Sequence, residues 1–381
     1  MPHFAAYDKC CSHLREKYLY RTLPSLVHVP TPLPLIADFS HNDYLGLSRH
    51  PLLIQRAQEY GELYGVGAKS SRILQRDQEI YLALEQKISR TKKTKCALIF
   101  NSGYQANATV LSSLLDKSVL RSEPLVFADR LNHASLHHGI RLAGVRQIRY
   151  RHLDMNHLET LLKTHHSQSN PKYIVTESVF GMDGDVTDLA VLTQLASQYG
   201  AFLYVDDAHA TGMLGEGGYG MTSAYVSGIH LSMGTFSKAV GASGAYVACS
   251  EGIRNYLVNR CSGFIYSTAP SPMVIGAVDA AWDLLPTLDA QRESIMDHAE
   301  YVRRDLLTLG LETFGSTTHI VPILLKTSEA CLVAQQKLRE QGILVSAIRP
   351  PTVPAHTARL RLGIGIDHTR QMTADVVRLL G

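Results

Sequence analysis

Apolar runs alternate with amphipathic stretches through the middle of the chain, beginning at about residue 96. We interpret the apolar runs as strands and the stretches between them as helices. This alternation predicts an α/β fold, with a mostly parallel sheet covered by helices on both faces. The successive segments are KCALIF, GYQANATVLSSLL, PLVFAD, HASLHHGIRLAG, KYIVTESVF, LAVLTQLASQYG, AFLYVDDAH, IHLSMGTFS and GAYVACS. Sheets of this kind bind ligands at the carboxyl ends of their strands.

The pattern changes after the helical stretch SPMVIGAVDAAWDLL. A long helix from about Leu288 to Leu309 is followed by short strands and further helices, which indicates a smaller α+β domain. We therefore expect an N-terminal arm over residues 1–45, a large ligand-binding domain over 46–285 and a small C-terminal domain over 286–381.

Composition narrows the class of protein. The chain has 381 residues, and its 37 Lys and Arg against 34 Asp and Glu give a formal charge of +3. The basic residues are scattered, with only short clusters such as KKTK and RLR, so we expect no nucleic-acid partner. The N-terminus lacks the apolar core of a signal peptide, and no segment approaches about 18 uninterrupted apolar residues. We expect a cytoplasmic protein with no membrane partner. Its 6 cysteines show no CxxC pair, which favours reduced thiols.

Polar residues follow several of the predicted strands. Ser102 and Gly103 open a helix whose N–H groups favour a phosphate, although Ser-Gly is also an ordinary helix cap. Asp206 ends a buried strand, where a carboxylate needs a partner cation or loses its charge. There are two alternatives. Asp206 could be a helix-capping aspartate, or it could bind a divalent metal together with Asp207 and His209. The metal alternative lacks a third spaced ligand, so we expect no metal.

Lys238 lies in LSMGTFSKAVGASG, among small and apolar residues. A lysine that acts as nucleophile or base near neutrality needs surroundings that disfavour its ammonium form, and an apolar strand end provides them. The alternative is an ordinary surface lysine with its charged end in water.

The segment GEGGYG, residues 215–220, matches the G-x-G-x-x-G pattern of dinucleotide-binding proteins. It does not immediately follow a strand. No acidic residue occurs between Glu216 and Glu251, where the ribose-binding carboxylate is expected. These absences disfavour a nicotinamide dehydrogenase.

The phosphate-binding turn, Asp206 and Lys238 together fit one ligand, pyridoxal 5′-phosphate (PLP). It has a phosphate, a ring nitrogen that can be protonated opposite a carboxylate, and a carbonyl that can condense with a lysine.

The chain resembles the α-oxoamine synthases, fold type I PLP-dependent transferases, from about residue 20 to its C-terminus. The segments that carry the resemblance are SHNDYLGLS, NSGYQAN, DRLNHASL, ESVFGMDGD, VDDAHATGMLGEGGYG, GTFSKAVGASGAYV, FIYSTAP and IRPPTVPAHTARLRL. IRPPTVP followed by TARLRL is most similar to the members that condense L-alanine with a pimeloyl thioester, on coenzyme A or a carrier protein, in biotin biosynthesis. The alternatives are a sister synthase that uses glycine or serine and a non-catalytic dimer partner. Such non-catalytic homologues typically lose the lysine, which is present here.

The resemblance implies roles at the cofactor. Lys238 matches the Schiff-base lysine, Asp206 the partner of the ring nitrogen, His209 a donor to the ring oxygen, and His133 the imidazole stacked on the ring. Gly103 and Tyr104 match the turn beside the phosphate, and Thr235 a hydroxyl that contacts the phosphate or orients the lysine. Ser267 and Thr268 resemble the stretch that reaches the phosphate of the neighbouring subunit, which implies a homodimer. The residues given catalytic roles are Lys238, His133, Asp206 and His209.

The resemblance also implies substrate-binding roles for Arg21, Asn42, Glu177, Thr352 and Arg361, the last as the clamp for the amino-acid carboxylate. Arg359 and Arg361 face the same way on a strand, so the assignment of the clamp could be exchanged between them.

The chain departs from the family pattern in several places. Lys69 and Gln75 stand where small residues are usual, Gly181 stands where a serine near the cofactor is common, and His356 replaces a frequent glycine. These departures concern the acyl-tail pocket and one cofactor hydrogen bond.

Overall fold

The computed structural model describes residues 4–23, 35–74, 76 and 78–381 of the chain. They form two compact units. One unit comprises residues 1–41, 182–185 and 294–381, and the other comprises 42–181 and 186–293. The second unit carries the predicted sheet and is described first.

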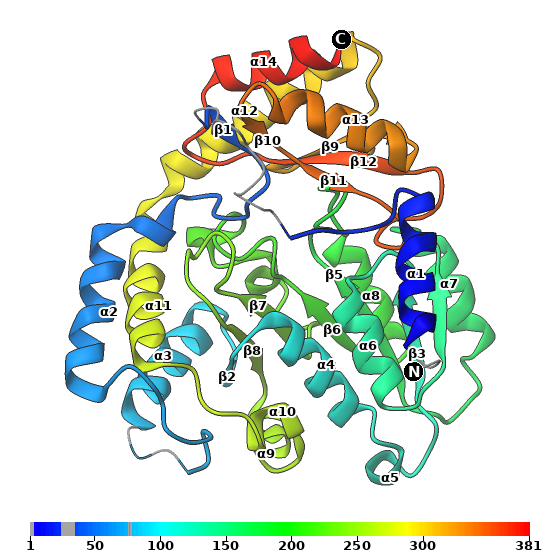
Figure 1. The fold of residues 1–381 in the computed structure, drawn as a ribbon. Helices are drawn as coiled ribbons and strands as arrows, with labels where there is room; N and C mark the ends of the chain where they lie inside the picture. Colours follow the sequence, from blue (N-terminus) through cyan, green and yellow to red (C-terminus); the bar gives the residue numbers. More distant parts are fainter. Residues whose placement is uncertain (1–3, 24–34, 75, 77) are drawn as a thin grey trace. The chain divides into compact units, whose positions relative to one another are not determined.

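A 7-stranded sheet forms the centre of the larger unit, in the order β2-β8-β7-β6-β5-β3-β4 (Figure 1). Strands β3 to β7 are all parallel to one another, whereas β8 is antiparallel to both β2 and β7. The mostly parallel α/β sheet predicted from the sequence is therefore confirmed. The strands are β2 (Cys96–Phe100), β3 (Leu125–Asp129), β4 (Gln147–Tyr150), β5 (Lys172–Glu177), β6 (Ala201–Asp206), β7 (Leu231–Thr235) and β8 (Ala245–Cys249).

Helices cover both faces of this sheet because successive strand residues point to opposite sides. Val126 packs in a core with α4 (Gly103–Leu114), α6 (Ala134–Leu142) and α9 (Glu251–Arg260). The next residue, Phe127, packs in a second core with α7 (Met155–Thr164) and α8 (Leu189–Gln198). These helices begin at residues whose side chains cap the first turn: Ser102, His133, Asp154, Asp188 and Ser250.

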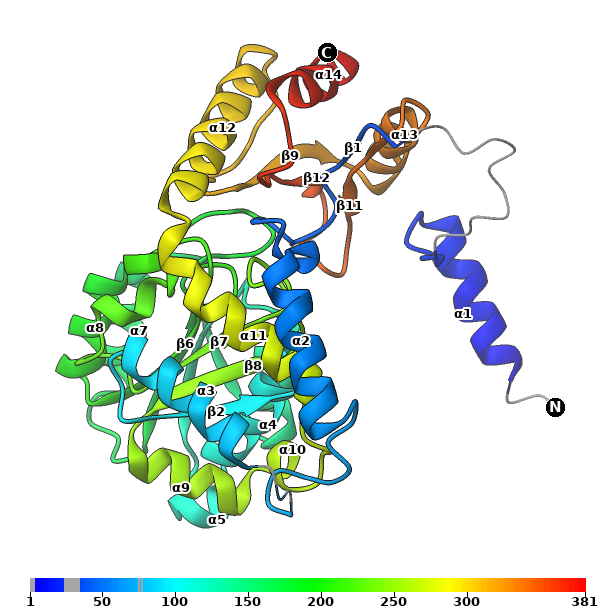
Figure 2. The same cartoon turned by 90° about the vertical axis from the view of Figure 1, so that its left-hand side faces the viewer.

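Further helices flank the β2 side of the sheet. Helix α2 (Pro51–Tyr64) lies along α11 (Pro272–Leu284), where a Cβ at Gly276 would be 2.5 Å from the carbonyl oxygen of Arg56 (Figures 1 and 2). Glycine thus allows the two helices to approach closely. The remaining helical elements are α3 (Gln78–Thr91), α5 (Lys117–Leu120), α10 (Ser262–Ile265) and the short turns η2 (Leu47–Arg49), η3 (Glu216–Gly218), η4 (Met221–Ala224) and η5 (Leu285–Thr287).

The smaller unit is an α+β structure. Its 3-stranded antiparallel sheet has the order β11-β12-β9, formed by β9 (Ile320–Lys326), β11 (Ser346–Ile348) and β12 (Ala358–Gly363). Near the N-terminus, β1 (Ala37–Asp38) pairs in parallel with β10 (Ile343–Leu344), which joins the two ends of the chain in one unit. Its helices are α1 (Ala5–Glu16), α13 (Ser328–Arg339) and α14 (Arg370–Leu380), while α12 (Asp289–Thr308) begins in the larger unit.

The three-part domain division stays a prediction. The pairing of β1 with β10, and the inclusion of residues 182–185 in the smaller unit, link segments that are distant in sequence. Among the described residues, no helix combines the length and the apolar character needed to cross a bilayer.

Candidate active site

Polar side chains gather where β5, β6 and β7 end. Glu177 is the last residue of β5 and Asp206 the last of β6, and the two are register partners. Thr235 ends β7, and Lys238 lies in the turn between β7 and β8. Because parallel strands have their carboxyl ends at the same edge, the sheet brings these predicted residues together.

Asp206 is buried, with 4% of its surface exposed. Its Oδ2 accepts a hydrogen bond from Asn107 Nδ2 at 2.7 Å, and its Oδ1 accepts one from the backbone N–H of Ala208 at 2.9 Å. Burial raises the pKa of Asp206, while the Lys238 ammonium and these hydrogen bonds act to lower it. The carboxylate is thus held where a cationic group would be its natural partner.

Asn107 is a site residue that the sequence analysis missed. Its Nδ2 also donates to Ser135 Oγ at 2.9 Å, and its Oδ1 accepts from the hydroxyl of Tyr204 at 2.8 Å. Ser135 Oγ in turn lies 2.7 Å from Nδ1 of His133. Asn107 therefore connects Asp206 to the His133 ring. The available signal was an amide on the mostly apolar buried face of α4.

His133 precedes α6, and its backbone N–H donates to Glu177 Oε1 at 2.5 Å. Burial lowers the pKa of the His133 imidazole. Burial, reinforced by the charge of Asp206, raises the pKa of Glu177 well above the usual carboxyl range. The site thus favours the neutral forms of His133 and Glu177.

Lys238 is half-buried, and its ammonium acts on the groups around it. It helps to lower the pKa values of Asp206, Glu177 and His133, which places its charge within reach of all three. The turn that carries Lys238 packs tightly against the segment that follows Asp206. A Cβ at Gly212 would lie only 2.5 Å from Cβ of Ala239. Small residues around Lys238 therefore reflect close contact between two loops.

His209 lies beside Tyr44, whose hydroxyl is 3.1 Å from His209 Nδ1 and donates to Asn42 Oδ1 at 2.9 Å. Gly181 approaches the opposite nitrogen, since a Cβ at this position would be 2.1 Å from His209 Nε2. The glycine that departs from the family pattern therefore makes room for the histidine ring in its present place.

The phosphate-side residues come from α4 and β7. Ser102 caps α4 by accepting from the backbone N–H of Gln105 at 3.2 Å, and Gly103 is the first residue of the helix. A Cβ at Gly103 would lie 3.7 Å from Thr235 Oγ1, so these two predicted residues are neighbours. The amide end of α4 and a hydroxyl form a suitable setting for an anion.

Tyr104 and the serine-threonine pair lie further out. Tyr104 is 48% exposed, and its ring meets that of His133 edge-on at a centroid distance of 6.3 Å. Ser267 Oγ accepts a hydrogen bond from Asn101 Nδ2 at 3.0 Å, and the carbonyl of Thr268 accepts from the same nitrogen at 2.7 Å. Ser267 and Thr268 are therefore joined to the segment that precedes the phosphate turn.

The other predicted substrate residues belong to the smaller unit. Arg21 Nη2 donates to Thr352 Oγ1 at 3.3 Å, so these two lie together. Arg359 and Arg361 are both buried on β12. The Arg359 guanidinium pairs with Asp183 and lies 4.1 Å from the centroid of the Phe314 ring. Arg359 thus has a partner within the smaller unit, and the assignment of Arg361 as the carboxylate clamp stays a prediction.

Two departures from the family pattern share a backbone feature. Lys69 has φ of +65° and His356 has φ of +62°, and both side chains are exposed. Glycine adopts this left-handed conformation most readily, which explains why small residues are usual there. Gln75 lies outside the described residues.

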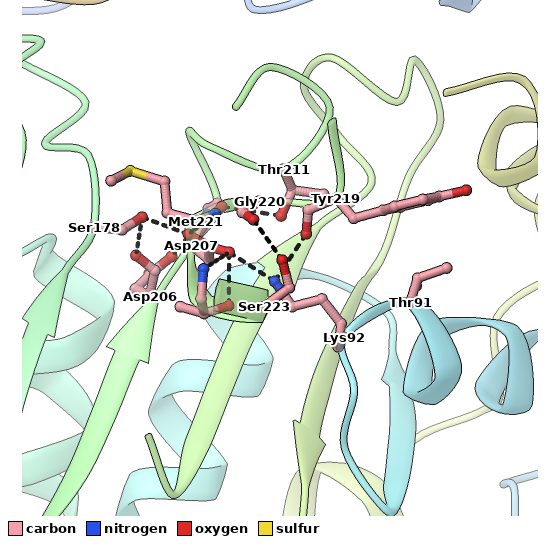
Figure 3. Close-up of polar contacts among 12 residues, drawn as sticks. Thr91, Lys92, Ser178, Asp206, Asp207, Thr211, Tyr219, Gly220, Met221 and Ser223 are labelled. Atoms are coloured by element: carbon pink, nitrogen blue, oxygen red, sulfur yellow. Dashed lines mark hydrogen bonds and ion pairs between the residues drawn. The ribbon is translucent and has the colours of Figure 1, made fainter. Parts of the chain in front are cut away.

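The metal alternative meets a geometric obstacle. Asp207 bonds to Lys92 Nζ at 2.8 Å (Figure 3). Asp206 bonds instead to Asn107, so the two carboxylates have different partners. In the smaller unit, His41, Asp367 and His368 lie close together. His368 already uses Nδ1 for the N–H of Gly365 and Nε2 for the carbonyl of Asp38.

The residues at the strand ends fit PLP. The anionic phosphate suits the N-terminus of α4, the ring nitrogen suits buried Asp206, and the aldehyde suits the amine of Lys238. Asp206 accepts a hydrogen bond from Asn107 and also interacts electrostatically with His133 and Lys238. The observed burial and charges therefore agree with the cofactor predicted from the sequence.

Comparison with known proteins points to the same class. The family model described as Aminotransferase class I and II matches residues 35–380. A putative 8-amino-7-oxononanoate synthase of Magnetococcus marinus is 48% identical over 377 residues, covering 97% of this chain and 94% of that protein. The 8-amino-7-oxononanoate synthase of Gluconacetobacter diazotrophicus is 51% identical over 347 residues, or 91% of this chain and 87% of that protein.

Solved structures share the fold. Serine palmitoyltransferase of S. paucimobilis with a bound PLP-myriocin aldimine is 25% identical, with a TM-score of 0.87 over 99% of this chain and 96% of that one. The 8-amino-7-oxononanoate synthase of Francisella tularensis is 26% identical, with a TM-score of 0.78 over 91% and 96% of the two chains. The chain therefore belongs to the aminotransferase class I and II family and, within it, to the fold type I PLP-dependent acyltransferases that these relatives represent.

Proposed function

We propose that the enzyme condenses L-alanine with a pimeloyl thioester, carried by coenzyme A or a carrier protein, and releases carbon dioxide to form 8-amino-7-oxononanoate for biotin. Relatives that carry this enzyme name are 42–51% identical to the chain. The observation that carries the proposal is the cluster of Lys238, Asp206 and His133 at the strand ends, in which the Lys238 ammonium interacts with the other two residues.

When bound, PLP withdraws electrons from the α-carbon of the amino acid and so stabilises negative charge there. Lys238 Nζ holds the cofactor before substrate arrives and then takes the α-proton. Asp206 keeps a proton at the ring nitrogen, for which its burial and its bonds to Asn107 and Ala208 prepare it. The neutral His133 ring covers the cofactor without adding a competing positive charge.

Arg361 binds the alanine carboxylate in this proposal. The α-carbon of alanine then forms a bond to the thioester carbonyl carbon, and the carbon–sulfur bond breaks to release the thiol. The carboxylate leaves as carbon dioxide, and a proton from Lys238 Nζ completes the amino ketone. His209, Gly103, Tyr104 and Thr235 contact the cofactor, and Arg21, Asn42, Glu177 and Thr352 border the substrates.

Borohydride reduction of the PLP-loaded enzyme, followed by peptide mass spectrometry, tests the anchor. We expect a pyridoxyl group on Lys238 and its loss in Lys238→Ala. Label on a different lysine would overturn the assignment.

Carbon dioxide release from alanine, glycine and serine, each with pimeloyl-CoA and with a pimeloyl carrier protein, tests the substrates. We expect a preference for alanine. A preference for glycine or serine would instead identify a sister synthase.

We also propose that the enzyme is a cytoplasmic homodimer. The segments around residues 66–74 and 266–271 are joined by the Ser71–Thr268 bridge and expose the apolar side chains Val66, Leu74 and Tyr266. Tyr266 alone is 84% exposed, which is unusual for an aromatic side chain unless a partner covers it. Light scattering should give twice the chain mass, and Tyr266→Glu should shift the enzyme towards monomer.

A further inference from the structure

A buried ion pair lies next to the cofactor residues. Lys92 directly follows α3 and is 1% exposed, and Asp207 directly follows Asp206 and is fully buried. Lys92 Nζ lies 2.8 Å from Asp207 Oδ2 and donates also to the carbonyl of Tyr219 at 2.8 Å (Figure 3). The proposed chemistry uses neither charge.

Asp207 is held by further donors. Ser178 Oγ donates to Oδ1 at 2.6 Å, and Thr222 Oγ1 donates to Oδ2 at 2.9 Å. The backbone N–H groups of Met221 and Thr222 add contacts at 3.3 Å. Although burial opposes both charges, Asp207 raises the pKa of Lys92, and Lys92 together with these hydroxyls lowers the pKa of Asp207. Both groups are therefore charged in the folded protein.

The glycine-rich segment GEGGYG closes over this pair. Gly215 and Gly220 have φ of +79° and +90°. A Cβ at Gly220 would lie 2.1 Å from Asp207 Oδ2, and one at Gly215 would lie 2.1 Å from the carbonyl oxygen of Gly220. The glycines are thus required by a loop that packs on a carboxylate, which gives this motif a role without a dinucleotide.

The backbone of Asp207, which lies between Asp206 and His209 in the chain, is bonded to neighbouring segments. The N–H of Asp207 donates to the carbonyl of Met233 at 2.7 Å, and its carbonyl accepts from the N–H of Thr211 at 2.8 Å. The N–H of Ser178 donates to the carbonyl of Asp206 at 2.8 Å. These backbone bonds join Asp206 and Asp207 to the ends of β5 and β7, and an Asp207→Asn substitution removes none of them.

The two aspartates are consecutive, so their charges act on the same site. Asp206 interacts with Lys238, His133, Glu177 and Tyr204, and Asp207 interacts with Lys92 and Tyr246. Without Lys92, a second uncompensated carboxylate would stand next to Asp206. This would disfavour an anionic cofactor and make Asp206 harder to keep ionised.

We propose that Lys92 is a positioning residue for the cofactor site. Its ammonium neutralises Asp207 beneath the GEGGYG loop, so that Asp206 is the carboxylate whose negative charge acts on the cofactor ring. This inference rests on the proposed role of Asp206. The sign of the electrostatic effect separates it from a purely structural role. PLP carries a negative phosphate, so loss of the cation and loss of the anion should have opposite consequences.

The test compares Lys92→Met, Asp207→Asn and the double variant in PLP binding, measured by fluorescence titration of the apoenzyme. We expect Lys92→Met to weaken PLP binding by about tenfold or more, Asp207→Asn to leave it unchanged or tighter, and the double variant to return to within about threefold of wild type. The pH midpoint of the visible absorbance change should move up in Lys92→Met and down in Asp207→Asn. If Lys92→Met does not fold, Asp207→Asn is the test by itself. A downward shift of its pH midpoint supports the inference, and the lack of a downward shift overturns it.

Lys93→Met is the matched control, since Lys93 pairs with Glu216 of the same loop at 3.0 Å but is exposed. It should bind PLP as wild type does. Equal weakening in both single variants without opposite midpoint shifts, or wild-type binding in Lys92→Met, would overturn the inference. Asp206→Asn is measured in parallel, because normal binding there would instead refute the proposed role of Asp206.

Discussion

Gly181 and His209 are in such close contact that a single methyl group on Gly181 would lie 2.1 Å from Nε2 of the histidine. The imidazole is fixed on its other side by the Tyr44 hydroxyl, 3.1 Å from Nδ1. The absence of a side chain at 181 and the place of the histidine ring therefore depend on each other.

Gly181→Ala should displace the His209 ring, because the added carbon cannot be accommodated without movement. We expect a loss of about 1–3 kcal/mol in stability and a marked fall in PLP affinity. Thermal unfolding and cofactor titration measure the two effects. Gly252→Ala is the control, since no atom lies within 4 Å of a Cβ there. Equal PLP affinities in the two variants would show that His209 adjusts freely.

Asn107→Ala should weaken the site through several groups at once. It removes the partners of Asp206 Oδ2, Ser135 Oγ and the Tyr204 hydroxyl, and buried polar atoms without partners cost about 1–3 kcal/mol each. We expect lower stability in urea and a turnover rate reduced by about tenfold or more. The exposed Asn259, which donates to the carbonyl of Asn255, provides the control Asn259→Ala. Full activity in Asn107→Ala would show that Asn107 is not needed by the active site.

Arg359 and Arg361 should differ in what their loss affects. Arg359→Gln leaves Asp183 buried without its cation, and we expect a loss of stability of about 3–5 kcal/mol, partly recovered by adding Asp183→Asn. Arg361→Gln should chiefly raise KM for alanine. Urea unfolding and steady-state kinetics distinguish the two, and the reverse pattern would exchange their roles.

Glu177→Gln should change the pH dependence of stability. Burial and Asp206 raise the pKa of Glu177 above its value in the unfolded chain. The stability that the protonated acid contributes is therefore fully present below the unfolded pKa and is lost as pH rises through the folded pKa. Glutamine mimics the protonated acid, so the variant should match wild type at low pH and exceed it at high pH. Chemical unfolding across pH measures this, and a constant difference would mean that the pKa of Glu177 is the same in the folded and unfolded states.

Short-range pattern was sufficient for the sheet. The centres of β5 and β6, YIV and FLYV, are uninterrupted apolar runs because both faces of these strands are covered. The same pattern placed Asp206 at the end of one buried strand and Lys238 just after another. The cofactor could be inferred because strand ends of a parallel sheet meet at one edge. Pairings between distant segments, such as β1 with β10, had no local signal.

The GEGGYG segment shows the limit of motif reading. Its glycines matched a nucleotide-binding pattern, yet they are needed because the loop packs against Asp207 and Lys92. Asn107 was missed for a related reason, since a helical asparagine gives no sign of its partners until the helix is placed on the sheet.

The sequence by itself determined the strand and helix alternation, the lysine and aspartate at the strand ends, and the family to which they belong. These follow from periodicity and from residue types close together in the chain. Only the tertiary structure decided that Asp207 pairs with Lys92, which arginine is tied to Asp183, and why residue 181 is a glycine. Those choices depend on contacts between residues far apart in sequence, where burial and charge are fixed by packing and not by local pattern.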